Sequence, residues 1–250
     1  MSPLVAYLLS LADDRLILGH RLSEWCGHAP ILEEDIALAN IALDCIGQSA
    51  LLYGIAAEAE GNVRTADQLV YFREGVEYRN LLLVEQTNGD FARTIVRQFL
   101  YDAFGILLFE RLQRSTHAPL AAVAQKAYKE LKYHFRHSSH WVVRLGDGTE
   151  ESISRTQRAV NDLWRYTDEM FGAGFPEAEL ITSGTAVDPQ LLRQEWRTSV
   201  EGIFAQTSLT IPDANTVMLT GGRTGRHTEN LGHLLAEMQI VARSYPEIAW

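Results

Sequence analysis

The sequence has little of what several protein classes require. Only two of its 250 residues are cysteines, Cys26 and Cys45, and they do not form a Cys-x-x-Cys pair, so a disulfide framework or a thiolate zinc site is unsupported. Lysine and arginine number 22 against 32 acidic residues, a net charge of −10, and no basic cluster is longer than two. A nucleic-acid groove therefore has no electrostatic footprint. We expect both thiols to be free and buried.

The sequence also shows no pattern typical of a targeting segment or of a membrane-spanning helix. The first apolar run covers 4–12, with no basic residue before it and three charged residues directly after it, which is not the pattern of a signal peptide. No later stretch reaches the roughly 20 uninterrupted apolar residues of a membrane helix. The sequence therefore predicts a cytoplasmic protein that contacts neither a membrane nor nucleic acid.

Proline is sparse, with seven residues, and the segments between prolines are rich in Ala, Leu, Glu, Gln and Arg. Ser2-Pro3 predicts a helix that runs to about residue 25, and Pro30 opens a second helix that ends before Gly61. Further helices are expected over 65–79, 91–114, 120–144, 152–171, 190–208 and 228–243, with an Asn-Gly turn closing 80–90. No long stretch alternates apolar and polar residues in the manner of a β-strand, so we predict no sheet. We predict one all-α domain over 1–250.

The second helix is apolar almost all round, and a helix of this kind is expected to be buried on all sides. Its polar exceptions, Asn40, Asp44 and Gln48, recur every four residues and so share one face. Buried polar groups need partners. We therefore predict a polar network at the centre of the bundle, with three candidate cations for Asp44, Asp102 and Glu130: Arg97, Lys126 and Lys129.

A bundle of long helices raises the hypothesis of a di-metal carboxylate enzyme. Such enzymes take a Glu from each of two helices and a Glu-x-x-His pair from each of the other two. In this sequence no Asp or Glu is followed at the third position by His, and Asp44 and Glu130 are followed there by Gly47 and Tyr133. The six-ligand cage for two irons cannot be assembled, so we predict no metal centre in this chain.

A wider Glu-x-x-x-His spacing occurs three times, as Glu24/His28, Glu130/His134 and Glu229/His233. The segment with His134, His137 and His140 is the best remaining metal candidate. Side chains three residues apart rotate by about 60° at each step, so these histidines fan across the helix. A partly solvated face is the interpretation we favour.

Two polar segments have alternative interpretations. The Gly-rich run at 221–228 precedes a helix and contains two arginines, so it is either a phosphate-binding loop or, as we favour, a surface loop that contacts another protein chain. In the corner at 73–80, Arg79 is a candidate partner for a phosphate and Tyr78 for a stacked base. An ordinary solvated turn is favoured there.

Five long motifs nevertheless resemble a known family. They are LSEWCGHAP at 22–30, ALANIALDCIG at 37–47, NLLLVEQTNGDFA at 80–92, AVDP at 186–189 and GGRTGRHTENLGHLLAEMQ at 221–239, followed by a C-terminal Trp250. Together they closely resemble the C-subunit family of bacterial 1,2-phenylacetyl-CoA epoxidases. The resemblance covers essentially the whole chain.

The resemblance implies a ferritin-like helical bundle with additional C-terminal helices and no cofactor of its own. It implies a catalytic A subunit that carries the di-iron site, further subunits and a reductase as partners. That complex inserts one oxygen atom into the ring of phenylacetyl-CoA to give the 1,2-epoxide, in aerobic phenylacetate degradation. The C subunit is then the non-catalytic structural partner that holds the A subunit in shape.

The resemblance also implies two groups of site residues, none of them catalytic. Contact with the coenzyme A part of the substrate, at the boundary between subunits, is expected from Glu77, Tyr78, Arg79, Asn80, Phe175, Pro176 and Glu177. The vestigial metal-site region comprises Asp44, Asp102, Lys129, Glu130 and His134. We further expect the segment 221–239 and the tail that ends in Trp250 to contact a partner subunit.

Two other classes of function remain open at the level of sequence. An independent di-metal carboxylate oxidase would hold iron at the centre of this chain. A free-standing helical ligand-binding protein would need no partner subunit.

Overall fold

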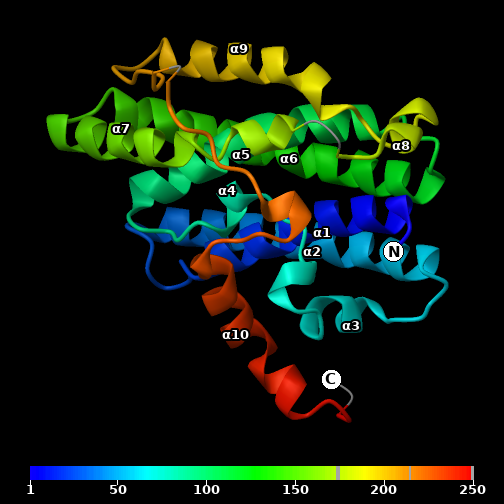
Figure 1. Cartoon of the computed structure of the whole chain (residues 1–250). Coiled ribbons are helices and arrows are strands. Elements are labelled where there is room, and N and C mark those ends of the chain that lie inside the picture. Colours follow the sequence, from blue (N-terminus) through cyan, green and yellow to red (C-terminus); the bar gives the residue numbers. More distant parts are fainter. Residues whose placement is uncertain (173–174, 214, 249–250) are drawn as a thin grey trace.

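The chain folds into layers of antiparallel helices (Figure 1), and the computed structural model describes residues 1–172, 175–213 and 215–248. Four long helices form the centre: α1 (Pro3–Ser23), α2 (Leu32–Ala59), α5 (Phe91–Leu112) and α6 (Ala118–Gly146). Helices α1 and α2 make one layer and α5 and α6 the next, with α2 also touching α6. No strand occurs in the described residues, and the predicted all-α class is confirmed.

Shorter elements cover this centre. In Figure 1, α7 lies beside α5 and α6, α9 lies above them, and α10 projects away from the other helices. The short α-helices are α3 (Ala66–Tyr71), α4 (Leu82–Glu85), α7 (Glu150–Trp164), α8 (Ala178–Thr182), α9 (Arg193–Phe204) and α10 (Glu229–Ser244). Single 3-10 turns are η1 (Gly75–Glu77), η2 (Asp168–Phe171), η3 (Pro189–Leu192) and η4 (Gly222–Thr224).

Helices α1 and α5 begin where local sequence signals place them, whereas α2 begins after Ile31, which makes no side-chain cap. The Ser2 side chain accepts a hydrogen bond from the Val5 amide at 3.3 Å, with Pro3 in the first helical turn. Asp90 caps α5 by accepting from the Arg93 amide at 2.9 Å. Such caps satisfy amides that have no partner within the helix, which is why these starts agree with the predictions.

The predicted helix at 65–79 is wrong in its extent, since α3 ends at Tyr71 and only the turn η1 follows. The reason is Arg73, a buried side chain whose guanidinium turns inward to the carboxylate of Asp13 on α1. The predicted helix at 152–171 likewise divides into α7 and η2. At Arg73 a tertiary contact thus overrides helical propensity.

The prediction that the second helix is buried on all sides is also wrong. Along one face of α2, four large apolar side chains are between 41% and 72% exposed: Leu32, Ile36, Leu43 and Leu51. The opposite face packs mainly against α1. By length and composition α2 is the one helix of the described residues that would suffice to cross a membrane, and half of its most apolar stretch is buried inside the protein.

The two cysteines have different environments. Cys45 on α2 is fully buried, as predicted, and burial raises the pKa of its thiol to about 12, so it remains protonated. Cys26 is exposed in the turn after α1, and the prediction that it is buried is wrong. Trp250, which is expected to contact a partner, lies outside the described residues.

Candidate functional site

The centre of the four-helix bundle contains a buried cation, Arg15 of α1. Its guanidinium carbon lies 4.9 Å from the ring centroids of both Tyr101 and Phe109 on α5, a geometry that favours cation–π attraction. Within the described part of the chain none of its three guanidinium nitrogens has a hydrogen-bond partner. Gly105 provides the space, because a Cβ there would lie 2.8 Å from Arg15 Nη2.

The acidic residue nearest this centre is Asp102, which is fully buried. It accepts hydrogen bonds from Ser138 Oγ and Gln98 Nε2, both at 2.8 Å. Burial raises the pKa of Asp102, and the charges of His134 and Arg15 counteract part of that rise. Both carboxylate oxygens of Asp102 therefore already have protein donors.

The polar network predicted for the second helix exists, although its members differ. His134 of α6 is fully buried, and its Nε2 lies 2.9 Å from the half-exposed carboxylate of Asp44. Gln48 is buried and donates to Glu130 at 2.8 Å, whereas Asn40 is exposed. The expectation that the histidine segment is a solvated face is thus wrong for His134.

The predicted cations are not the ones that enter the centre. Lys129 is exposed, and Lys126 reaches Glu130 only at 4.0 Å, with its side chain mostly exposed. Arg97 is buried elsewhere, where it donates to the Asn88 side chain at 2.7 Å. The cation at the centre is Arg15, which the sequence reasoning missed.

These residues do not suit a divalent metal. No group of three or more His, Cys, Asp and Glu side chains is placed to hold a metal ion within the described ranges. A guanidinium beside Asp102 also repels a second cation in a medium of low dielectric constant. The chemistry of the centre is that of a fixed protein charge held by aromatic rings and hydrogen bonds.

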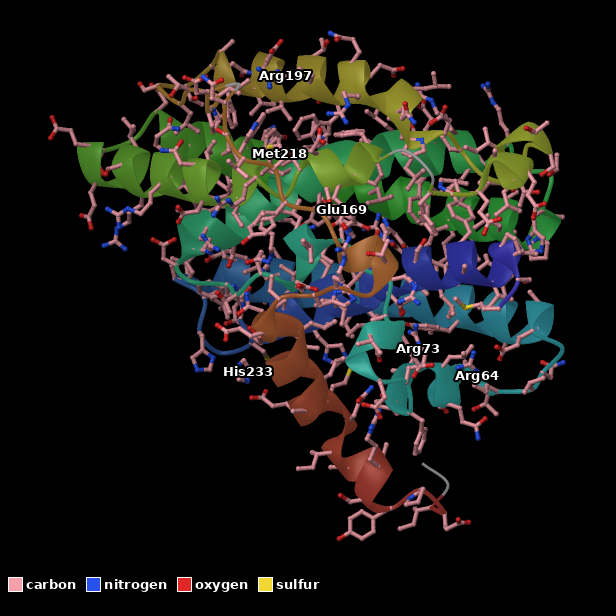
Figure 2. The ribbon with its side chains drawn as sticks, in the orientation of Figure 1. Arg64, Arg73, Glu169, Arg197, Met218 and His233 are labelled. Carbon is pink, nitrogen blue, oxygen red and sulfur yellow. The ribbon has the colours of Figure 1, made fainter. Side chains whose placement is uncertain are left out.

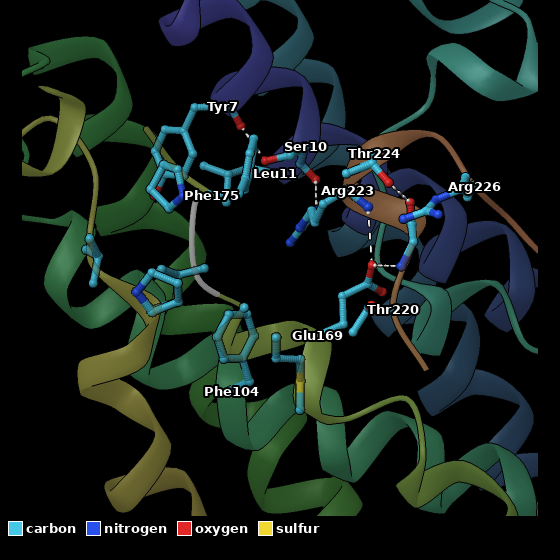
Figure 3. Close-up of a pocket in the computed structure, with 17 residues that line it drawn as sticks. Tyr7, Ser10, Leu11, Phe104, Glu169, Phe175, Thr220, Arg223, Thr224 and Arg226 are labelled. Carbon is cyan, nitrogen blue, oxygen red and sulfur yellow. Dashed lines mark hydrogen bonds between the residues drawn. The ribbon is translucent and has the colours of Figure 1, made fainter. Parts of the chain in front are cut away.

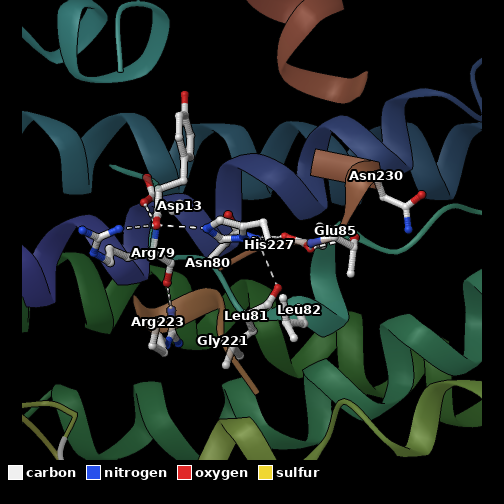
Figure 4. Close-up of polar contacts among 12 residues, drawn as sticks. Asp13, Arg79, Asn80, Leu81, Leu82, Glu85, Gly221, Arg223, His227 and Asn230 are labelled. Carbon is white, nitrogen blue, oxygen red and sulfur yellow. Dashed lines mark hydrogen bonds and ion pairs between the residues drawn. The ribbon is translucent and has the colours of Figure 1, made fainter. Parts of the chain in front are cut away.

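A second polar region, which we call the polar clasp, joins the loops at 73–85 and 220–228 to α1 (Figure 4). Glu169 joins the same loops to η2. The acceptors of the clasp are four buried carboxylates, those of Asp13, Asp14, Glu85 and Glu169. Arg73 and Glu169, labelled in Figure 2, are buried, whereas His233 on α10 is exposed. The clasp ties segments that are more than 200 residues apart in the chain.

Asp14 and Glu169 hold the second loop. Asp14 accepts from Arg223 Nη1 and Nη2 at 3.0 and 2.7 Å and from the Leu81 amide at 2.8 Å. Glu169 accepts from the amides of Leu82 and Gly221, both at 2.8 Å. Bidentate pairing of this kind combines charge with a fixed orientation.

Glu85 is the most heavily bonded member of the clasp. Its carboxylate accepts from Asn80 Nδ2 at 2.9 Å, His227 Nδ1 at 2.8 Å, the Thr228 amide at 2.7 Å and the Thr228 hydroxyl at 2.9 Å. Burial lowers the pKa of His227, but the hydrogen bond and charge of Glu85 outweigh it and the pKa of His227 is raised. The protonated imidazole is therefore favoured inside the clasp.

The first group of residues expected to contact coenzyme A, 77–80, lies in this clasp. Tyr78 and Asn80 are fully buried, and the Arg79 amide donates to Asp13 at 2.7 Å. Glu77 is exposed and accepts from the Glu74 amide. The side chains of Tyr78 and Asn80 thus have no surface to present to a ligand in this conformation.

The glycines at 221–225 permit close packing of the loop on its own chain. A methyl group at Gly222 would overlap the Asn80 carbonyl oxygen, and one at Gly225, where φ is +79°, would overlap that of Val76. Because Arg223 pairs with Asp14, the feature that suggested a phosphate loop serves an internal contact.

The second group, 175–177, lies about a cavity beside the clasp. Phe175 and Pro176 line a space of about 400 Å³ together with residues from α1, α5 and the 220–226 loop. Glu177 is exposed and does not line it. The structure therefore does not bring the seven expected contact residues into one site.

The layers of helices around a polar centre define a helical-bundle protein of the ferritin-like class. Comparison with known protein families agrees with this class. The family model described as phenylacetic acid catabolic protein matches residues 1–250, and the chain belongs to this family, whose fold is ferritin-like. The chain is 46% identical over 250 residues to the C subunit of the 1,2-phenylacetyl-CoA epoxidase of Escherichia coli (strain K12), with the whole of both chains covered. The resemblance inferred from the sequence motifs is confirmed.

Proposed function

We propose that this chain is the non-catalytic structural subunit of a cytoplasmic 1,2-phenylacetyl-CoA epoxidase in phenylacetate degradation. Its main partner is the A subunit, which carries the di-iron site and oxidises the ring of phenylacetyl-CoA with electrons supplied through a reductase. Further subunits complete the complex. The full-length similarity to the C subunit of such an epoxidase supports this assignment.

The non-catalytic role is inferred mainly from the side chains at the centre of the bundle. Di-iron proteins of this architecture present carboxylates and Glu-x-x-His pairs inward. Here the inward groups include the Arg15 guanidinium and an Asp102 carboxylate bonded to Ser138 and Gln98. A fixed positive charge at the centre of the bundle disfavours the binding of two metal ions there.

The exposed face of α2 supports the partner role. Its large apolar side chains Leu32, Ile36, Leu43 and Leu51 are exposed along one helix, and between residues 36 and 57 only Asp44 is ionisable apart from the buried Cys45 and Tyr53. Among the described residues, nothing outside the neighbouring backbone of α2 lies within 4 Å of a Cβ built at Gly47 or Gly54. Exposed apolar surface of this extent marks a protein interface, and we assign it to the A subunit.

In this proposal fewer of the expected residues contact coenzyme A directly. Atoms at the surface are available from Glu77, the half-buried Arg79 and Glu177, whereas Tyr78 and Asn80 contribute by holding the loop in place. We propose that Arg79 is the member of this group that faces the substrate's phosphates, because a guanidinium suits that charge.

Co-expression of this chain with an A subunit, followed by size-exclusion chromatography, tests the interface. Leu43→Glu places a charge at the centre of the α2 face and should weaken association by at least about 30-fold. The matched control Leu191→Glu changes an equally exposed leucine on η3 and should leave co-elution unchanged. Both variants should keep the wild-type melting temperature, since neither leucine is buried.

Three outcomes would contradict parts of the proposal. Wild-type co-elution of Leu43→Glu would remove the α2 face from the interface. Metal analysis that finds about two irons per chain in the isolated protein would instead support an independent di-metal oxidase. A chain that never co-elutes with an A subunit would support the free-standing ligand-binding alternative.

A further inference from the structure

The cavity beside the clasp has the form of a small-molecule site (Figure 3). Its volume of about 400 Å³ falls within the roughly 300–1,000 Å³ typical of ligand pockets. Its described lining comes from α1, α5, η2, the stretch around η3 and the 220–226 loop. It is separate from the bundle centre that contains Arg15.

Most of the wall is apolar and aromatic. The Phe175 and Tyr7 ring centroids lie 6.3 Å apart at an interplanar angle of 52°. Aliphatic side chains and prolines complete the wall: Leu11, Leu108, Met170, Pro176, Val187 and Pro189, with Phe104 from α5. A planar aromatic ligand finds both flat and edge contacts in such a wall.

Tyr7 contributes a buried polar atom without a partner. The residue is 3% exposed, and its hydroxyl forms no hydrogen bond within the described residues, although the Val187 backbone faces it. Burial raises the pKa of Tyr7, and the Val187 backbone and then the charge of Arg223 counteract part of that rise. The hydroxyl is therefore a protonated donor close to a cation, and a buried donor of this kind normally has an acceptor.

Two arginines line the cavity, and the charge of one of them, Arg223, acts on Tyr7. Arg223 lies with its guanidinium carbon 5.6 Å from the Phe175 ring centroid, while its two Nη atoms bind Asp14 and backbone carbonyls. Arg226 is exposed, and its side chain makes no hydrogen bond in the part of the chain described. Glu169 also lines the cavity, but backbone amides already occupy its oxygens.

We propose that this cavity binds a small aromatic carboxylate, with the ring against Phe104 and Phe175 and the carboxylate at the Tyr7 hydroxyl, near the charge of Arg223. The described lining of this site comes from several segments of this chain. The choice of an arylacetic acid within this class rests on the proposed function. The general class rests on the apolar wall, the free donor and the cationic rim.

Isothermal titration calorimetry on the purified full chain, without an A subunit, tests the site with phenylacetate as the probe. We expect saturable binding of one molecule per chain. Hexanoate carries the charge without the ring, and 2-phenylethanol carries the ring without the charge. Each should bind at least about tenfold more weakly, and coenzyme A on its own should not compete.

Variants connect the binding to the named residues. Tyr7→Phe removes only the hydroxyl and should weaken phenylacetate binding about tenfold, as expected for a hydrogen bond to a charged group. Arg226→Gln removes a charge from the exposed lining of the cavity, so it should weaken binding less than Tyr7→Phe does and should reduce its dependence on salt. Tyr128→Phe and Arg197→Gln make the same changes at residues that do not line the cavity and should bind like the wild type.

Three results would overturn the inference: no saturable binding of phenylacetate at millimolar concentration, equal affinity for 2-phenylethanol, or an unchanged Kd in Tyr7→Phe. A filled cavity gives an independent check, because Val187→Trp should abolish binding while the chain still co-elutes with the A subunit. A wild-type chain that co-elutes but never binds phenylacetate would refute this site and leave the structural role standing. Loss of co-elution in the wild type would refute the structural role instead.

Discussion

Glu85→Gln should lower stability strongly because it removes charge from a carboxylate that four donors share. The donors to one oxygen are Asn80 Nδ2 and His227 Nδ1, and those to the other are the amide and hydroxyl of Thr228. A glutamine must place its NH₂ group against one of these pairs. The loss of stability is smaller if the NH₂ group points toward His227, because the neutral imidazole can accept a hydrogen bond from it. In that orientation the buried Asn80 donor is left unpaired.

The magnitude follows from these contacts. One unpaired buried donor costs about 1–3 kcal/mol, and a lost hydrogen bond to a charged group about 1.5–3 kcal/mol. We expect a loss of about 3–5 kcal/mol in the free energy of unfolding, and for a chain of this length each kcal/mol shifts Tm by about 2–4 °C. Glu201→Gln, at an exposed ion pair with Arg197, should cost less than about 1 kcal/mol.

The same variant should change the pH dependence of stability. Because the folded-state pKa of His227 is raised, its contribution is fully present below the unfolded value near about 6.5 and is lost as pH rises through the folded value. Urea unfolding at a series of pH values should show the largest difference between wild type and Glu85→Gln below about pH 6.5, shrinking above it. A difference of under about 1 kcal/mol, or one independent of pH, would refute this account of the clasp.

Three further predictions concern packing and the buried cation. Gly222→Ala should lower the free energy of unfolding by about 1–3 kcal/mol, because the methyl group overlaps the Asn80 carbonyl. Gly47→Ala should instead raise it by about 0.5–1 kcal/mol and weaken association with the A subunit. Thermal unfolding measures the stability of both variants, and co-elution measures the association. Arg15→Met removes a charge that lowers the pKa of Asp102, so stability in urea should fall further than in the wild type as pH rises above about 3.9. A pH profile identical to the wild type would contradict a role of Arg15 in compensating Asp102.

Much of the fold follows from local signals in the sequence. Sparse prolines, the Ser2 and Asp90 caps and the helical spacing of apolar residues place the long helices within a few residues of their observed bounds. The absence of a Glu-x-x-His pair also directs attention away from a metal centre. These signals depend only on neighbours in the chain, so they can be read without tertiary information.

The sites depend on contacts that no local pattern reveals. Asp14 and Arg223 are 209 residues apart, and Glu85 and His227 are 142 apart. The charged triplet at 13–15 interrupts an otherwise apolar helix. This pattern was the one local indication that the first helix buries at least one charge. An apolar face on α2 likewise cannot tell from sequence alone whether its cover comes from the same chain or from a partner.

In the proposed complex this chain supports a catalytic partner and performs no chemistry itself. The most direct measurement is the rate at which a purified A subunit, supplied with its reductase, converts phenylacetyl-CoA to the epoxide with and without this chain. We predict that the A subunit by itself is nearly inactive, that adding the wild-type chain restores turnover, and that adding Leu43→Glu does not. Full turnover by the A subunit in the absence of this chain would contradict the structural role.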